Sequence, residues 1–159
     1  MTAPVEGPRL RAASGEDVAR LLEIERAAHS HPWSEAQLRS ELGNAYSRVL
    51  GAELPGGGEG GSARIAGFIV YWVIHDEMHI LDVVTAPEAR RRGLARALMV
   101  AAMEDARGRG AGRAMLEVRR SNAPAIALYR TLGFLHDTVR RGYYQDGEDA
   151  ILMSLALGR

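Results

Sequence analysis

The order of hydrophobic patterns along the chain restricts the fold more than any other feature of the sequence. Segments rich in β-branched and aromatic residues predict strands, and segments with apolar residues three and four positions apart predict helices. In chain order the patterns predict a strand, two helices, three strands, a helix, a strand, a helix and two strands. This order predicts a mixed α/β fold, in which about four helices flank a mostly antiparallel twisted sheet of about seven strands.

The expected boundaries follow from capping and helix-breaking residues. The expected strands cover residues 9–13, 46–52, 65–74, 78–85, 114–118, 135–143 and 150–157. Two expected helices begin after the caps Ser14 and Ser34, and the other two cover residues 91–109 and 122–132. We expect residues 1–8 to form a loose tail and the glycine-rich residues 53–64 to form a flexible loop. No internal repeat is visible, so we expect a single domain over residues 1–159.

Composition and charge exclude several classes of function. The 159 residues are 47% hydrophobic and 25% charged, as in ordinary soluble domains. Basic and acidic residues balance at 20 each, so no overall field attracts nucleic acid or membrane. The absence of cysteine and lysine excludes thiolate and lysine chemistry. The sequence has no secretion signal pattern and no apolar run of membrane-spanning length, so we expect a cytoplasmic protein.

The segment Val83–Arg96 contains the most informative motif. A strand ends near Pro87, a turn rich in arginine and glycine follows, and a helix begins. The first N–H groups of a helix have no partner within it, and the helix dipole adds partial positive charge. Gly93 and Ala95 leave room for a pyrophosphate to approach the backbone. The motif alone predicts phosphate binding only weakly, because an ordinary loop or an arginine-rich nucleic-acid patch has a similar composition.

A family resemblance makes the motif more specific. Arg90, Gly93 and Ala95 match the Arg/Gln-x-x-Gly-x-Gly/Ala signature of the GNAT acetyltransferases and follow the fourth expected strand, as in that family. Motifs near both ends of the chain resemble its ribosomal-protein-alanine N-acetyltransferases, the RimI group. The further matching segments are residues 31–34, 116–119, 121–129, 132–134, 140–144 and 148–150. The resemblance covers Arg9–Leu157 and implies the GNAT fold.

The resemblance implies that acetyl-CoA is the co-substrate and that no metal takes part. In this family the end of the fourth strand pairs with pantetheine and directs an amide N–H at the thioester carbonyl, while the helix start holds the pyrophosphate. A helix-capping asparagine also contacts the pantetheine arm. The implied acetyl-CoA-binding residues are Val83, Val84, Thr85, Arg91, Arg92, Gly93, Leu94, Ala95, Arg96 and Asn122.

The same resemblance implies a catalytic pair, Glu117 as base and Tyr129 as acid. Taken alone, Glu117 is either a base whose pKa rises among apolar neighbours or a strand residue that faces solvent by alternation. Tyr129 is either an acid that protonates the departing thiolate or a core tyrosine. The presence of both favours an enzyme over a non-catalytic acyl-CoA-binding module.

The implied acceptor is a protein N-terminus, and the RimI-like motifs favour the N-terminal alanine of a small-subunit ribosomal protein. Trp33, Tyr143 and Tyr144 are the expected acceptor-groove residues, although hairpin aromatics are commonly buried. An acidic cluster in the last hairpin is expected to attract a basic stretch of the acceptor; it consists of Asp146, Glu148 and Asp149. Another N-terminus, a lysine or a small amine remains an alternative acceptor.

Two local features depart from these patterns. Asp82 stands where RimI relatives tend to carry asparagine, which affects the acceptor more than the chemistry. The segment His75–His79 is rich in possible metal ligands, but it lies at an expected strand turn and lacks the order of a zinc-protease helix. We expect no metal there.

Overall fold

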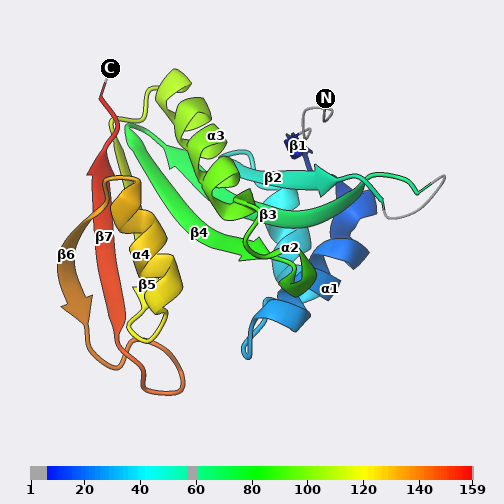
Figure 1. The fold of residues 1–159 in the computed structure, drawn as a ribbon. Coiled ribbons are helices and arrows are strands. Elements are labelled where there is room, and N and C mark those ends of the chain that lie inside the picture. Colours follow the sequence, from blue (N-terminus) through cyan, green and yellow to red (C-terminus); the bar gives the residue numbers. More distant parts are fainter. Residues whose placement is uncertain (1–6, 57–60, 159) are drawn as a thin grey trace, which may run out of the picture. The chain divides into compact units, whose positions relative to one another are not determined.

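A computed structural model describes residues 7–56 and 61–158 (Figure 1). These residues form two compact units. The first unit contains the chain up to Val70 and Asp82–Ala102, and the second contains Tyr71–Leu81 and the chain from Met103 onward. The tail residues 1–6 and loop residues 57–60 of the sequence predictions lie outside the described residues.

The described residues form seven strands and four α-helices, which confirms the predicted α/β class. The strands hydrogen-bond in the order β1-β2-β3-β4-β5-β7-β6, and β4 with β5 is parallel whereas β1 with β2, β5 with β7 and β6 with β7 are antiparallel. The elements are β1 (Arg9–Ala12), α1 (Val18–Ala28), α2 (Glu35–Leu42), β2 (Ser47–Leu54), β3 (Arg64–Ile74), β4 (Glu77–Thr85), α3 (Leu94–Gly108), β5 (Arg113–Arg119), α4 (Ala123–Thr131), β6 (Leu135–Arg140) and β7 (Ala150–Ala156), with short 3-10 turns at Gly15–Asp17 and Pro87–Ala89.

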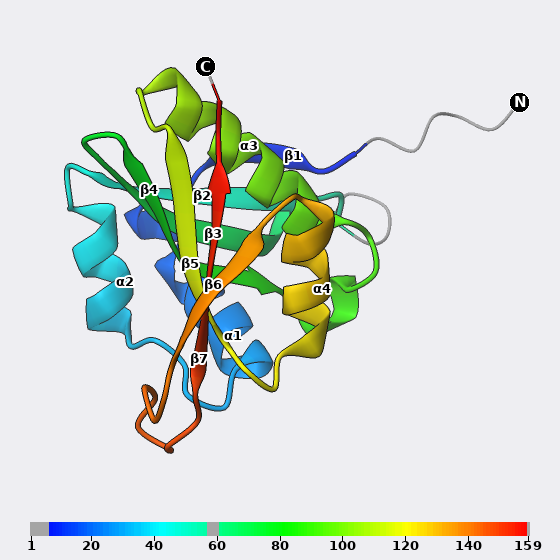
Figure 2. The ribbon, with the colours of Figure 1, turned by 90° about the vertical axis from the view of Figure 1, so that its left-hand side faces the viewer.

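Capping residues start both helices of the N-terminal part of the first unit. Ser14 and Asp17 form a capping box at the 3-10 turn before α1, and Ser34 accepts the Gln37 N–H at the start of α2. One face of α1 is apolar and buried, and one residue on that face, Glu25, is an acid. The views in Figures 1 and 2 place α2 and the first turns of α3 on opposite sides of β3. No described helix is long and apolar enough to span a membrane.

A glycine allows β3 and β4 to approach closely within the first unit. A Cβ placed on Gly67 would lie 3.0 Å from the backbone oxygen of Val84 and 3.5 Å from the Leu98 side chain. Phe68, Ile69 and Val70 follow Gly67 and are fully buried. Gly67 therefore sets the spacing between the core of this unit and the end of β4.

In the second unit, β5 alternates between the two faces of the sheet. Leu116 and Val118 are buried, and Glu117 between them is exposed. The helix α4 lies along one face of β5, β7 and β6 (Figures 1 and 2). It is capped by Asn122, whose side chain accepts the Ala125 N–H at 3.3 Å. This confirms the capping role expected of Asn122.

Several expected boundaries were wrong, for local reasons. The third helix begins at Leu94 instead of Arg91, because Arg91 and Gly93 have positive φ angles of 67° and 73°, which no α-helix contains. The sixth strand ends at Arg140 instead of Tyr143, because Gly142 also has a positive φ, of 61°. The second strand extends to Leu54, so the glycine-rich loop is shorter than residues 53–64.

The close approach at Gly67 gives a stability prediction. We expect Gly67→Ala to lower the free energy of unfolding by about 1–3 kcal/mol, because the added methyl group meets a backbone oxygen that cannot move aside alone. Urea unfolding followed by circular dichroism measures the change. Gly112→Ala is the matched control, since a Cβ there meets nothing within 4 Å. Equal or greater stability of Gly67→Ala would contradict the prediction.

Candidate active site

The expected site residues are divided between the two compact units. The first unit contains Trp33, Val83–Thr85 and Arg91–Arg96, and the second contains Glu117, Asn122, Tyr129, Tyr143 and Tyr144. Within each unit, the structure shows which of these residues lie together.

The turn between β4 and α3 has the geometry of an anion-binding helix start. Gly93 takes the N-cap position, because its carbonyl accepts the Ala97 N–H at 3.0 Å. Glycine has no side chain that could cap the N–H groups of the first turn. A Cβ built on Gly93 would meet nothing within 4 Å, and residues 90–93 are exposed. The outer side of the turn is therefore open, and the residues present fit a pyrophosphate.

The strand end that precedes this turn is held by its neighbour in the first unit. The Ala86 N–H donates to the Ala66 oxygen at 2.7 Å. Val84 is buried, whereas Val83 and Thr85 are half-buried. The side chains of Val83 and Thr85 therefore lie on the less buried face of β4, where the expected pantetheine contacts are placed.

The candidate base is not enclosed by apolar residues. Glu117 is exposed because alternate residues of β5 point to opposite faces, so its apolar neighbours Leu116 and Val118 point away from it. Of the two surroundings that the sequence left open, the structure shows the strand residue that faces solvent. Its carboxylate instead lies 3.5 Å from the Arg140 guanidinium and accepts a hydrogen bond from the Tyr143 phenol.

Both candidate acceptor-groove tyrosines belong to this Glu117 cluster. The hydrogen bond to Glu117 raises the pKa of Tyr143, and burial raises the pKa of Tyr144 to about 12. The two rings meet edge to face, with centroids 5.2 Å apart. The Arg119 guanidinium stacks 4.0 Å from the centre of the Tyr144 ring. The structure thus brings the candidate base and two candidate acceptor residues together.

Tyr129, the candidate acid, is buried in α4. Its ring centroid lies 6.0 Å from that of Phe134, and its carbonyl accepts the Phe134 N–H at 3.0 Å. These contacts fix the end of α4 against the start of β6, and Gly133 makes the turn with a φ of 102°.

The acidic cluster of the last hairpin is already paired within the chain. Arg119 lies 2.8 Å from Asp146 and 3.0 Å from Glu148, and Arg120 lies 3.1 Å from Asp149. A hydrogen bond from Ser121 lowers the pKa of Glu148, and the Gly142 N–H lowers the pKa of Asp149. These two arginines compensate part of the charge of the three carboxylates, and the attraction of a basic stretch stays a prediction.

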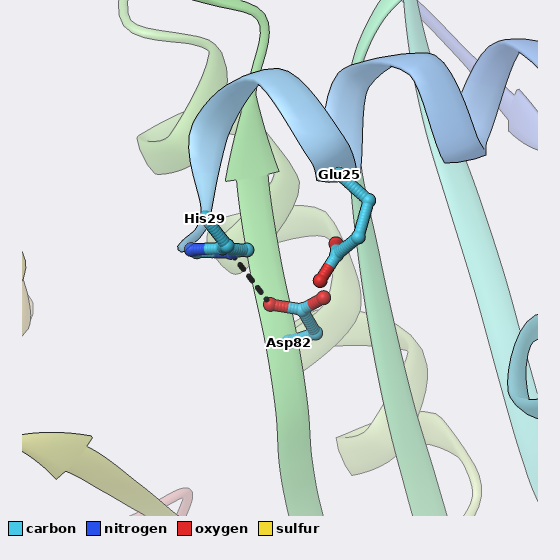
Figure 3. Close-up of side chains that lie close together, drawn as sticks. All are labelled: Glu25, His29 and Asp82. Atoms are coloured by element: carbon cyan, nitrogen blue, oxygen red, sulfur yellow. Dashed lines mark ion pairs between the residues drawn. The ribbon is translucent and has the colours of Figure 1, made fainter. Parts of the chain in front are cut away.

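Sequence reasoning missed a polar group in the first unit, formed by Glu25, His29 and Asp82 (Figure 3). Glu25 is only 1% exposed, and its Oε1 accepts the Trp33 N–H at 3.1 Å. Asp82 lies on β4 directly before Val83, and its Oδ1 is 3.4 Å from His29 Nε2. Burial and the neighbouring carboxyl group of Asp82 raise the pKa of Glu25, which favours its neutral form.

Comparison with known proteins decides the family. The sequence pattern of the acetyltransferase (GNAT) family matches residues 18–134. The chain belongs to the GNAT family. It is 39% identical over 147 residues to the ribosomal protein bS18-alanine N-acetyltransferase of Salmonella typhimurium, over 91% of this chain and 94% of that enzyme. The enzyme of the same name from Escherichia coli K12 is 40% identical over 144 residues, 89% of this chain and 92% of that enzyme.

Solved structures agree with this assignment. The crystal structure of the ribosomal-protein-S18-alanine N-acetyltransferase from Escherichia coli superposes with a TM-score of 0.82 at 34% identity, over 96% of this chain and 95% of that chain. As a GNAT member, the chain is an acetyl-CoA-dependent N-acetyltransferase. The predictions of family, fold and co-substrate are confirmed.

The sequence of this GNAT enzyme did contain a signal for the buried polar group. Val18, Leu21 and Leu22 form the apolar face of α1, and Glu25 follows Val18 by seven positions and Leu21 by four. Helical spacing therefore places Glu25 on the buried face, and His29 one turn later on the same side. Asp82 was noticed only as a departure from asparagine.

The geometry of the three side chains does not by itself define a metal site. Their ligand atoms lie within 4.8 Å of one another. Ligands bound to one zinc ion at about 2.0–2.2 Å are at most about 4.4 Å apart, so this upper bound allows a metal ion but suits protons and hydrogen bonds equally. In the segment His75–His79, His79 and Glu77 pair at 3.1 Å at the start of β4, directly after a turn where His75 has a positive φ of 54°.

The raised pKa of Glu25 predicts a specific pH dependence of stability. The ordinary pKa of 4.5 rises to about 9 in the folded chain, so the contribution of Glu25 is complete below about pH 4.5 and is lost as pH rises towards 9. Glu25→Gln cannot ionise. We expect the parent to lose stability relative to Glu25→Gln between pH 5 and pH 9, by up to about 1.4 kcal/mol per pH unit.

Chemical denaturation at several pH values measures this difference. Glu23→Gln is the matched control, because Glu23 lies on the same helix with an exposed side chain and pairs with Arg20 and Arg64. A constant stability difference between the parent and Glu25→Gln across this range would contradict a buried neutral Glu25.

Proposed function

We propose that this enzyme acetylates the N-terminal α-amine of a protein, and that its acceptor is the N-terminal alanine of ribosomal protein bS18. The observation that carries the proposal is the similarity to two enzymes named for this activity, which extends over about nine tenths of both chains. A ribosomal protein as acceptor supports a cytoplasmic location for the enzyme.

The chemistry of the acceptor supports an α-amine over a lysine side chain. Attack on a thioester needs a neutral amine. An α-amine has an ordinary pKa of about 7.8, and a lysine amine has one of about 10.4, so far more of the α-amine is neutral at cytoplasmic pH. An N-terminal acceptor therefore depends less on the exposed Glu117 to remove a proton from the amine.

Glu117 is the proposed base, acting through a water molecule. The amine nitrogen forms a bond to the acetyl carbon, the carbon–sulfur bond breaks, and the proton that the amine loses passes to Glu117. Tyr129 supplies a proton to the sulfur that leaves. A phenol, with an ordinary pKa of about 10, is a weaker acid than a thiol, with one of about 8.5, so this transfer is uphill by about 1.5 pKa units. It therefore requires the phenol to lie against the sulfur while the carbon–sulfur bond breaks.

Acetyl-CoA binding is proposed at the strand end and helix start of the first unit, and the role of Asn122 is proposed separately, from the family resemblance. Backbone groups of Val83–Thr85 pair with the pantetheine arm, the N–H groups of residues 91–96 hold the pyrophosphate, and Asn122 adds a hydrogen bond to the arm. The open outer side of Gly93 supports this placement. Trp33, Tyr143 and Tyr144 are the proposed contacts for the acceptor.

A competition experiment tests the acceptor. An Ala-starting bS18 peptide, the same peptide with a blocked N-terminus and one lysine, and a free polyamine are mixed with enzyme and acetyl-CoA. We expect the acetyl group on the α-amine of the Ala-starting peptide, located by mass spectrometry, at least tenfold faster than elsewhere. Acetyl transfer mainly to the lysine or the polyamine would overturn the acceptor assignment and leave the family assignment intact.

Substitution of the proposed base and acid tests the mechanism. We expect Glu117→Gln and Tyr129→Phe each to lower kcat by about a hundredfold, because each removes one proton-transfer group. Isothermal titration with acetyl-CoA is expected to give an unchanged Kd for both variants. Glu148→Gln is the control carboxylate, because Glu148 lies in the last hairpin and is paired to Arg119. If both variants match the kcat of the parent, these roles are wrong.

A further inference from the structure

Three buried polar atoms of the first unit face one another without hydrogen-bond partners. They are Glu25 Oε2, Asp82 Oδ2 and His29 Nε2, and the side chains converge from α1 and β4 (Figure 3). A buried polar atom without a partner costs about 1–3 kcal/mol. Two carboxylates that face each other also repel when both are ionised. The arrangement therefore requires a positive charge or a proton between the two acids.

A single proton satisfies the contact between the acids. If the Glu25 carboxyl carries it, its hydroxyl donates to Asp82 Oδ2, while Asp82 Oδ1 remains 3.4 Å from His29 Nε2. One negative charge then remains on Asp82, next to an imidazole that can donate to it. The titratable groups that face Glu25 are Asp82 from β4 and His29, the residue directly after the end of α1, and the loop that follows faces it with the Trp33 N–H.

The other oxygen of Glu25 connects this pair to the loop that follows α1. Glu25 Oε1 accepts the Trp33 N–H at 3.1 Å, and Ser34 directly afterwards caps α2. The backbone position of Trp33 therefore depends on a side chain that is itself bound to β4. Asp82 is the residue before Val83, so the same contact joins the proposed acceptor residue to the strand proposed to bind the pantetheine arm.

We propose that Glu25 and Asp82 share one proton and that this acid pair positions Trp33 for binding of the acceptor. The proposal rests on the proposed function, in which Trp33 contacts the acceptor peptide. Glu25 and Asp82 are positioning residues and take no part in the transfer of the acetyl group. When the shared proton is lost, the two carboxylates repel, and the loop that carries Trp33 moves away from β4.

The amide analogues of the two acids have predictable effects. Glu25→Gln places an N–H group opposite Asp82 and keeps an oxygen for the Trp33 N–H, so it copies the protonated acid at every pH. Asp82→Asn places an N–H group opposite an ionised Glu25 and also removes the need for the proton. Glu25→Ala removes both contacts.

Steady-state kinetics with the Ala-starting peptide test the proposal between pH 7 and pH 9.5. We expect the KM of the parent for the peptide to rise about fourfold by pH 9.5, relative to the KM of Glu25→Gln. With a pKa of about 9, only about a quarter of the parent molecules keep the proton at that pH and can bind the peptide. Asp82→Asn is expected to lack this rise. Glu25→Ala is expected to have a raised peptide KM at every pH, whereas Glu25→Gln is expected to keep the low peptide KM. The KM for acetyl-CoA is expected to stay constant.

Two controls define what would overturn the proposal. Glu23→Gln, on the exposed side of α1, is expected to follow the parent at every pH. The proposal fails if the parent and Glu25→Gln have the same pH dependence of peptide KM. It also fails if Zn²⁺ raises the Tm of the parent by several degrees but not that of Glu25→Gln, because a metal ion then occupies the site instead of a proton.

A measurement without any acceptor separates this proposal from the proposed function. The chain has two tryptophans, so Trp33 fluorescence can be followed alone in a Trp72→Phe background. We expect its emission to shift between pH 8 and pH 10, and Glu25→Gln in the same background to abolish the shift. If the shift occurs but the Ala-starting peptide is not acetylated, the shared proton stands and the acceptor assignment fails. If no shift occurs, the shared proton is wrong whatever the acceptor is.

Discussion

A carboxyl group enclosed by protein must be neutral, bonded or paired with a cation, and Glu25 imposes this requirement on the first unit. Its side chain is 1% exposed on a helix face that otherwise carries apolar residues. An alanine or leucine at this position would pack α1 without any polar partner. Because the residue is an acid, α1 can pack only where β4 supplies Asp82 and the following loop supplies the Trp33 N–H.

The consequence is that two segments with different proposed tasks share one contact. The loop after α1 carries Trp33, and β4 continues from Asp82 into the residues proposed to bind the pantetheine arm. Gly67 adds a second constraint on β4, because only a residue without a side chain allows β3 so close to the Val84 oxygen. The end of β4 is thus fixed from two sides before the chain turns into α3.

The sequence predicted the order and type of the elements because each has a strong hydrophobic period and a clear cap, as at Ser34 and Asn122. It placed the start of α3 three residues too early, because the left-handed conformation of Arg91 cannot be read from residue type. For Glu117 the sequence left two surroundings open. Its apolar neighbours suggested burial, but adjacent strand residues face opposite sides, and the alternation of the strand predicted the observed exposure. The ion pairs of the acidic hairpin could not be predicted, because their partners, Arg119 and Arg120, are distant in sequence.

The exposure of Glu117 bears on the choice of acceptor. A lysine amine must lose a tightly held proton before it can attack, whereas a substantial part of an α-amine is neutral at the working pH. An N-terminal acceptor therefore makes the smaller demand on Glu117, whose exposed carboxylate lies 3.5 Å from Arg140 and accepts the Tyr143 phenol.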